Sequence, residues 1–323
     1  MKKFNRFAGL AMASVMMFSM AACTKTGGST GAGNGDASVK ESTNVTESTT
    51  AAESTTVTEA SESTANAEVE INEANFPDKV FREFIKIKAD KDGNGILSKQ
   101  EIENCQMIMN FDDGQQQGII LSKDITSLKG IEFLTNLKRL EIEGENLTEL
   151  DLSHNEELER IQLYRTKLTS LDLSHNRKLT YLWLTYCEMT QIDLSANTEL
   201  NDLSISFVPI NEINLNNNKK LQRLEISVTN IEKIDLSNAP ELQTLFLETD
   251  KLTALDVSHN PLLVYARITC NKIKSLDVSS CPELNNVVKK GKKTKGSNEW
   301  EIKKDNMTYR YLLVDSDCKV ITK

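Results

Sequence analysis

The chain has 323 residues, of which 39% are hydrophobic and 26% are charged, and its formal net charge is −9. This composition excludes a membrane protein with several spans, and the acidic balance excludes a strongly basic nucleic-acid binder. The one long apolar run lies at the N-terminus, so any link to a membrane is expected there.

Residues 1–22 have the pattern of a secretory signal peptide. Lys2, Lys3 and Arg6 precede an apolar stretch at 7–20, which is too short for a stop-transfer helix. The stretch ends in Met-Ala-Ala before Cys23, which resembles a bacterial lipobox. The resemblance implies cleavage before Cys23, acylation of its sulfur and usually of its new amine, and lipid anchoring at the outer face of the cytoplasmic membrane. The alternative is a plain signal peptide followed by an unrelated cysteine.

From Cys23 to residue 70 the sequence is a low-complexity mixture of Ser, Thr, Ala, Gly and Glu without an aromatic residue. Such a segment cannot bury enough apolar area to offset the entropy lost on ordering. We therefore predict that 23–70 is a disordered, mildly acidic linker that holds the folded part away from the bilayer.

A small helical cap is predicted at 71–115. Pro77 and Asp78 suit the start of a helix. A second helical pattern covers 99–110. The first helix has an apolar stripe near helical spacing, formed by Val80, Phe81, Phe84, Ile85 and Ile87.

The segment between these helical patterns fits the twelve-residue calcium loop of an EF-hand. Side chains with oxygen atoms occupy the first, third, fifth and ninth places, and Gly95 permits the sharp turn at the sixth. The twelfth place is a glutamate, which can bind calcium with both oxygens. A solvated acidic turn is the alternative. The predicted ligands are Asp90, Asp92, Asn94, the carbonyl of Ile96, Ser98 and Glu101.

The sequence contains a single loop of this kind, whereas EF-hands usually pair through the eighth residue, here Leu97. We therefore predict that Leu97 and the flanking helices find cover on the first end of the repeats described next. The site is then structural, with an affinity for calcium on the order of 10⁻⁴ M. A dockerin-like module that binds cohesin is a competing interpretation, although such modules normally contain two loops.

Repeats of 21 residues fill most of 116–284, with 116–136 as a degenerate joining unit. The units follow the pattern LxxLxLxxxxLxxLDLSxNxx, and their six apolar places hold only Leu, Ile, Val, Met or Ala. One unit cannot bury its own apolar side, whereas stacked units bury a continuous core. We predict a β-rich solenoid with little helix and one short parallel strand per unit. The units start at Leu137, Leu158, Leu179, Leu200, Leu221, Leu242 and Leu263.

One asparagine recurs in most units, at a place where its amide can bond the backbone of the turn, but Ala239 and Cys281 interrupt this column. The spacing resembles the bacterial 21-residue leucine-rich-repeat class. Together with the lipobox, the linker and the calcium loop, it resembles surface lipoproteins of Firmicutes, which implies a binding role. The chain departs from many leucine-rich repeats because the place after LxxLxL holds asparagine only at Asn271. The column is Asn155, Asn176, Asn197, Asn218 and Asn260.

The last segment, 285–323, is predicted to form a strand-rich C-terminal cap. Its lysines between 289 and 295 are expected in a solvated loop, with contact to an anionic wall polymer as the alternative. The cysteines after Cys23 are irregularly spaced, which argues against a disulfide framework. A bridge between Cys270 and Cys281 is left open.

The sequence contains no GxSxG, HExxH or phosphate-loop motif, so we do not expect an enzyme. His154, His175 and His259 share one place in the repeat, which favours an exposed turn over a metal pair. An aspartate column also recurs at one place, which indicates a role in the fold. Its members are Asp151, Asp172, Asp193, Asp235, Asp256 and Asp277.

Function is expected where the units differ, on the outward strand positions of the concave face. We predict a patch centred on Trp183, because aromatic residues and arginine dominate interface energetics. The predicted function is recognition of a protein or glycan at the cell surface, with membrane contact through the lipid alone and no nucleic acid. The alternative is a calcium-dependent accessory or dockerin-like component of an extracellular polysaccharide system. The patch is Arg160, Gln162, Tyr164, Tyr181 and Trp183.

Overall fold

The computed structural model describes residues 68–110, 124–270, 272–295, 297–304 and 307–323. The predicted signal peptide, Cys23, almost all of the linker and Asn271 lie outside these described residues. Within the described part, no helix has the length and apolar character needed to cross a membrane.

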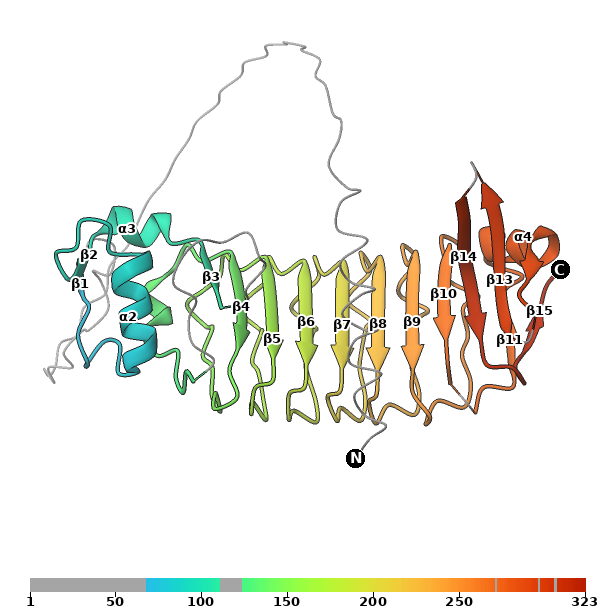
Figure 1. The fold of residues 1–323 in the computed structure, drawn as a ribbon, viewed down its shortest axis with the longest axis horizontal. Coiled ribbons are helices and arrows are strands. Elements are labelled where there is room, and N and C mark those ends of the chain that lie inside the picture. Colours follow the sequence, from blue (N-terminus) through green and yellow to red (C-terminus); the bar gives the residue numbers. More distant parts are fainter. Residues whose placement is uncertain (1–67, 111–123, 271, 296, 305–306) are drawn as a thin grey trace, which may run out of the picture. The chain divides into compact units, whose positions relative to one another are not determined.

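Successive repeat units each contribute one short strand to a parallel sheet (Figure 1). The strands pair in register, so that Leu140 lies opposite Ile161 and Ile161 lies opposite Leu182. This arrangement confirms the predicted β-solenoid with little helix. The strands are β4 (Arg139–Glu143), β5 (Arg160–Tyr164), β6 (Tyr181–Thr185), β7 (Asp202–Ser206), β8 (Arg223–Ser227), β9 (Thr244–Glu248) and β10 (Tyr265–Ile268).

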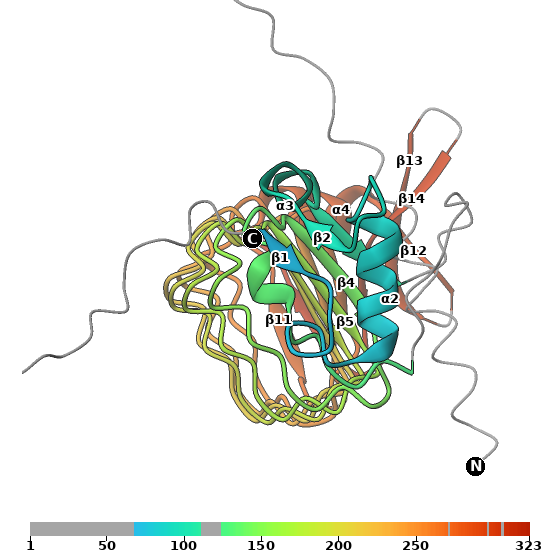
Figure 2. The ribbon, with the colours of Figure 1, turned by 90° about the vertical axis from the view of Figure 1, so that its left-hand side faces the viewer.

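The core lies between this sheet and the LDL segments on the opposite side of each coil. Viewed along the stack, the coils lie one behind another (Figure 2). Five of the six apolar places are buried in every unit. The sixth, the first apolar residue of the LDL segment, is only partly buried in most units, as at Ile192 and Ile213. Burial of one such aliphatic side chain contributes about 1.5–3 kcal/mol, and it requires the neighbouring unit to be in place.

The asparagine column ties each unit to the one before it. The side-chain amide of Asn176 donates to the carbonyl oxygens of Leu152 at 3.1 Å and Asn155 at 2.9 Å. The other four asparagines of the column make the equivalent pair of bonds. In place of asparagine, Cys281 directs its Sγ to the carbonyl of Val257 at 3.4 Å. The predicted role of the column is therefore confirmed.

The N-terminal cap begins with helix α2 (Lys79–Lys88), which Asp78 caps by accepting the N–H of Phe81. Phe81, Phe84 and Ile85 are buried, as the apolar stripe predicts. Ile87 is 45% exposed, so its place in the stripe is wrong. It lies two residues after Ile85, about 200° around the helix, and therefore on the other side.

The second helix is shorter than predicted, because α3 (Lys99–Asn104) ends well before residue 110. The chain continues as β3 (Met107–Met109), which pairs in parallel with β4 and places Ile108 opposite Leu140. The open edge of β4 offers backbone partners that a longer helix would leave unmet. The strand that pairs with the outer edge of β4 is therefore 107–109.

The cap and the repeats share one hydrophobic core. Phe76 is fully buried, with its ring centroid 5.9 Å from that of Phe81 and 5.8 Å from that of Phe133, in the 3₁₀ turn Ile131–Phe133. The carboxylate of Asp78 also accepts the N–H of Thr126 at 2.9 Å and its hydroxyl at 2.6 Å. These contacts join α2 to the first end of the repeat array.

The C-terminal segment extends the sheet beyond the repeats, as the predicted strand-rich cap requires. β14 pairs in parallel with β10, and β13 and β12 follow in antiparallel order. Helix α4, which the sequence did not predict, starts at Pro282 inside the last repeat pattern. The five cysteines of the described residues are buried free thiols, so Cys270 and Cys281 are not bridged. The elements are β11 (Ser275–Asp277), α4 (Pro282–Lys290), β12 (Lys292–Lys293), β13 (Asn298–Lys304), β14 (Met307–Val314) and β15 (Lys319–Ile321), which pairs with β11.

The asparagine column yields a matched pair of variants. Asn218→Ala removes two buried hydrogen bonds to the preceding unit, of 3.1 and 2.9 Å, and should lower the free energy of unfolding by about 2 kcal/mol. Asn217→Ala removes one exposed bond of 2.9 Å to Ser195 and should cost less than about 0.5 kcal/mol. Urea unfolding measures both, and equal losses would contradict this role of the column.

Candidate functional site

Hydrogen bonds between side chains and the backbone hold the predicted calcium loop in a tight turn. Asp90 accepts the N–H groups of Gly93 at 2.8 Å and Gly95 at 2.9 Å, one with each carboxylate oxygen. Both glycines have positive φ, 73° and 81°, which a residue with a side chain rarely adopts. Asn94 accepts the N–H of Ile96 at 2.7 Å. These bonds fix the loop backbone around a common centre.

Three carboxylates converge at this centre. The ligand atoms of Asp90, Asp92 and Glu101 all lie within 4.8 Å of one another. Calcium prefers oxygen ligands at about 2.3–2.6 Å, so one ion can reach all three. Three negative groups this close repel each other unless a cation lies between them. The donor set and its spacing therefore fit calcium.

Glu101, the predicted bidentate ligand, is fixed by burial and by several hydrogen bonds. It is 7% exposed and accepts the N–H of Lys91 at 2.6 Å and both the N–H and hydroxyl of Ser98. Burial alone would raise the pKa of Glu101, but these hydrogen bonds outweigh it and hold the pKa below its usual range. Ser98 is engaged as the N-cap of α3, in a reciprocal capping box with Glu101.

A strand from the start of the described chain occupies the pairing edge of the loop. β1 (Val69–Glu70) lies antiparallel to β2 (Ile96–Leu97), with Val69 opposite Leu97. Ile71 continues the pairing by donating its N–H to the carbonyl of Gly95 at 2.9 Å. Leu97 is fully buried in the core that the cap shares with the repeats, as predicted. Its backbone partner, however, is β1, which the sequence analysis had assigned to the end of the linker.

The five residues of the predicted patch lie together on β5 and β6. The register places Arg160 beside Tyr181 and Gln162 beside Trp183. The Arg160 guanidinium carbon lies 3.4 Å from the ring centroid of Tyr181, and its Nε donates to Glu141 at 2.6 Å. Burial raises the pKa of Tyr181 to about 12, so its hydroxyl remains a hydrogen-bond donor at physiological pH.

Small hydroxyl side chains follow the aromatic residues on the same face, at the end of β6 and on β7. Thr185, Ser204 and Ser206 point outward but are at most 8% exposed. Within the described residues their hydroxyls have no hydrogen-bond partner. Leaving a buried hydroxyl unpaired costs about 1–3 kcal/mol. These three residues were not part of the predicted patch, although Ser204 and Ser206 are successive small outward residues on β7.

Two carboxyl groups border these hydroxyls. Burial raises the pKa of Asp202 and of Glu225, although Arg223 opposes the shift in both. Arg223 donates to Glu225 at 2.6 Å and lies 4.0 Å from Asp202. Its guanidinium also covers the ring of Phe246, with 4.9 Å to the centroid. β7 and β8 therefore present a charged cluster next to the aromatic patch.

A further set of residues, which the sequence analysis missed, follows the strands directly. Tyr186, Phe207 and Val228 occupy equivalent places and have φ values of 54°, 56° and 51°. Left-handed backbone costs a residue with a side chain about 1–2 kcal/mol, and it is rarest for β-branched residues. The rings of Tyr186 and Phe207 stack at 4.5 Å, and Val228 is 48% exposed. We call these three residues the ridge.

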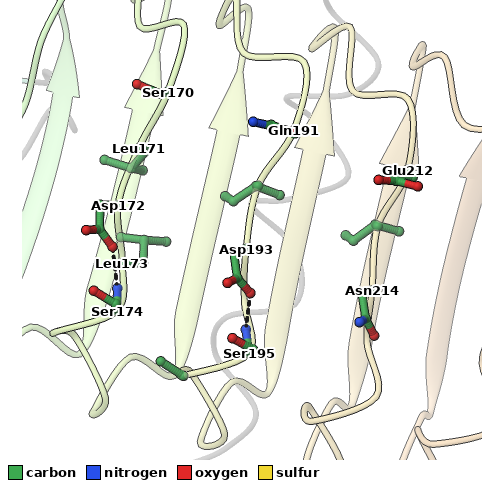
Figure 3. Close-up of a pocket in the computed structure, with 13 residues that line it drawn as sticks. Ser170, Leu171, Asp172, Leu173, Ser174, Gln191, Asp193, Ser195, Glu212 and Asn214 are labelled. Carbon is green, nitrogen blue, oxygen red and sulfur yellow. Dashed lines mark hydrogen bonds between the residues drawn. The ribbon is translucent and has the colours of Figure 1, made fainter.

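The opposite side of the coils carries a groove of about 620 Å³ along the LDL segments. Asp172 accepts the N–H of Ser174 at 2.9 Å, and Asp193 accepts that of Ser195 at 2.8 Å (Figure 3). Every aspartate of the column makes this bond to the serine two residues later. The predicted structural role of the column is confirmed. Among the described residues, the histidines join no cluster suited to a metal ion.

Comparisons with known proteins agree with the architecture. The family model described as Leucine Rich repeat matches residues 145–159 and 165–181. A comparison with curated proteins gives no match. The repeat match and the strand ladder together show a leucine-rich-repeat solenoid.

Solved structures similar to this chain include three proteins of Listeria monocytogenes. The functional domain of InlJ, which includes a cysteine ladder, is 23% identical, with 68% of this chain and 65% of that chain covered and a TM-score of 0.28. The internalin InlF is 19% identical, with 69% of this chain and 77% of that chain covered and a TM-score of 0.40. Internalin C2 is 20% identical, with 64% of this chain and 100% of that chain covered and a TM-score of 0.42. The chain thus spans slightly less than two thirds of the InlJ domain.

The aspartate column makes stability depend on acid. Hydrogen bonds from the N–H of Ser174, and then from its hydroxyl, lower the pKa of Asp172. The N–H and hydroxyl of Ser195 lower the pKa of Asp193 in the same way, and the hydroxyl and N–H of Ser237 lower that of Asp235. A carboxyl whose folded pKa is lowered stabilises the fold above its unfolded pKa, about 3.9, and loses this effect as the pH falls through the folded value. The melting temperature should therefore decrease as the pH is lowered below about 4.

The triple variant of Asp172, Asp193 and Asp235 to asparagine tests this dependence. Asparagine can keep the turn, because Asn214 makes the same bond to Asn216 at 3.0 Å. The melting temperature of the variant should fall less steeply below pH 4 than that of the parent, as measured by circular dichroism. Asp202 and Glu225 have raised pKa values and therefore affect stability in the opposite sense, but they are present in both proteins. Parallel curves would contradict the assignment.

Proposed function

We propose that this chain is a cell-surface lipoprotein that recognises an extracellular protein through the patch on β5 and β6. The observation that carries the proposal is the gathering of Arg160, Tyr181 and Trp183 on two adjacent strands of a regular sheet. Leucine-rich-repeat solenoids are generally binding scaffolds and not enzymes, and they use such extended surfaces for recognition.

The patch has features that favour tight binding. Aromatic residues and arginine are the usual hot spots of protein interfaces. Arg160 is already held between the carboxylate of Glu141 and the ring of Tyr181, so little side-chain entropy is lost when a partner binds it.

The proposed location rests on the sequence. The lipobox at Cys23 supplies the lipid anchor, and the linker that follows supplies the distance from the membrane. In this arrangement the repeats are displayed outside the cytoplasmic membrane, where an extracellular partner can reach them.

The proposed role of calcium is to stabilise the cap. The loop centre holds Asp90, Asp92 and Glu101, and α2 joins it to the first repeat through Asp78 and Phe76. An ion bound there would neutralise the carboxylates and hold α2 and α3 together. The pairing of β1 with Leu97 favours this capping role over a dockerin-like accessory, because β1 takes the edge that a second loop would use.

The central substitution for the patch is Trp183→Ala. It should weaken binding of the partner at least about tenfold, because truncation of a central aromatic costs about 2 kcal/mol or more. The partner is first identified on an array of extracellular proteins and glycans, and affinities are then measured by surface plasmon resonance. Leu262→Ala removes another exposed apolar side chain, 51% exposed, outside the sheet strands and should have no effect. If the Trp183 variant binds the partner as tightly as the parent, the patch is not the binding site. If only a glycan binds, the proposal of a protein partner is wrong.

Calcium should raise the melting temperature of the parent protein, and a chelator should reverse the increase. Glu101→Gln should abolish the response, because an amide lacks the charge and bidentate geometry that calcium requires. Glutamine at this place can keep the capping box of α3, so the helix start survives. Glu103→Gln on the same helix is the control. An unchanged melting temperature of the parent at 10-fold excess over a dissociation constant of about 10⁻⁴ M would exclude the site.

A further inference from the structure

The ridge of Tyr186, Phe207 and Val228 cannot be explained by the backbone it occupies. Its turns require positive φ, for which glycine is the natural choice. The chain instead places Arg165 and then the three ridge residues there, one per unit. Strained backbone of this kind is concentrated at functional sites. The three apolar side chains of the ridge follow one another on adjacent units, which makes this row a candidate for binding.

The ridge continues the proposed patch. Tyr164 of the patch meets Tyr186 edge to face, with 5.7 Å between ring centroids, and Tyr186 stacks on Phe207. The row therefore leads from the patch, across three units, to the exposed side chain of Val228. A partner bound to the patch has a continuous apolar path along it.

A groove of about 720 Å³ lies beside the ridge. One wall is apolar and includes Phe207, Pro209 and Val228. Glu248, Asp250 and Asp315 also line it, and within the described residues Glu248 and Asp250 form no ion pair. Among the described residues that line the groove, Lys251 is the one cation, and its Nζ donates to the side-chain oxygen of Asn230 at 2.9 Å.

The apolar wall of the groove suits an apolar side chain, and its carboxylates suit a positive charge, so a ligand with both would fit. Phe207 and Asp250 belong to units two repeats apart, about 10 Å along the stack. About three residues of extended chain cover that distance. A segment with leucine or an aromatic residue and a nearby lysine or arginine matches both walls. An anionic lipid or polymer would be repelled by the three carboxylates.

We propose that the ridge and the acidic groove form a docking site for an extended segment of the partner protein that combines apolar and cationic side chains. This proposal rests on the proposed function and adds the chemistry of the segment that is recognised. It predicts affinity that weakens with salt, because part of the attraction is between charges that remain near solvent.

The full chain is titrated against three fluorescein-labelled nine-residue peptides by fluorescence anisotropy. Their sequences alternate leucine with lysine, leucine with glutamate, and serine with lysine. The leucine–lysine peptide should bind at least tenfold more tightly than either of the others. Equal binding of the leucine–glutamate peptide, or no binding of any peptide, overturns the proposal.

Val228→Gly separates binding from folding. Glycine relieves the left-handed strain, so the melting temperature should stay the same or rise, while affinity for the leucine–lysine peptide falls at least fivefold. Arg165→Gly is the matched control, since Arg165 has the same φ, 52°, but lies outside the groove. The Arg165 variant should bind the leucine–lysine peptide as tightly as the parent, or slightly more tightly because a positive charge has been removed. Parental affinity of the Val228 variant overturns the proposal.

The double variant Glu248→Gln/Asp250→Asn tests the acidic wall. It should lower the affinity for the leucine–lysine peptide at least fivefold and make that affinity depend less on salt. Unchanged affinity would contradict the docking groove. Trp183→Ala distinguishes the two levels of the account. If Trp183→Ala abolishes binding of the identified partner and Val228→Gly does not, the docking groove is contradicted and the patch is supported. If Val228→Gly abolishes binding and Trp183→Ala does not, the patch is contradicted and the docking groove is supported.

Discussion

The structure depends on contacts between identical places of neighbouring units, above all the buried aliphatic residues and the amides of the asparagine column. No unit can bury its leucines alone, and each asparagine completes its hydrogen bonds only with the carbonyls of the preceding unit. The side-chain oxygens of these asparagines have no partner within the described residues, so the column carries a cost as well as a gain. Stability therefore lies at the junctions between units, and both ends of the array need cover.

The two ends are covered in different ways. At the first end, the start of α2 packs through Phe76 and Asp78, and β3 pairs with the open edge of β4. At the other end, β14 continues the parallel sheet from outside the repeats. Because the repeats fix the backbone so regularly, the outward side chains are free to vary. The patch, the hydroxyls of β7 and the ridge are three such variations on adjacent units.

The repeat spacing was sufficient to predict the solenoid, the in-register strands and the asparagine bonds, because each follows from periodic burial of the same places. The loop template likewise predicted residues whose carboxylates do converge. Three features depended on partners distant in sequence. Residues 105–110 continue a helical pattern in the sequence, but 107–109 form a strand because the edge of β4 lies beside them. Residues 69–70 belong to the linker by composition, but they form β1 because the backbone of β2 pairs with them. The ridge was missed because residues after a strand were treated as turn, and positive φ at Phe207 is not visible in sequence.

The central claim is that the units stack in register and that β3 at one end and β14 at the other continue their sheet. Hydrogen–deuterium exchange of the full chain, resolved to single amides, tests it most directly. The account predicts slow exchange that recurs every 21 residues at the strand amides from Leu140 onward and extends to Ile108 and Leu312. Protection without this period, or fast exchange at Leu140 and its equivalents, would contradict it.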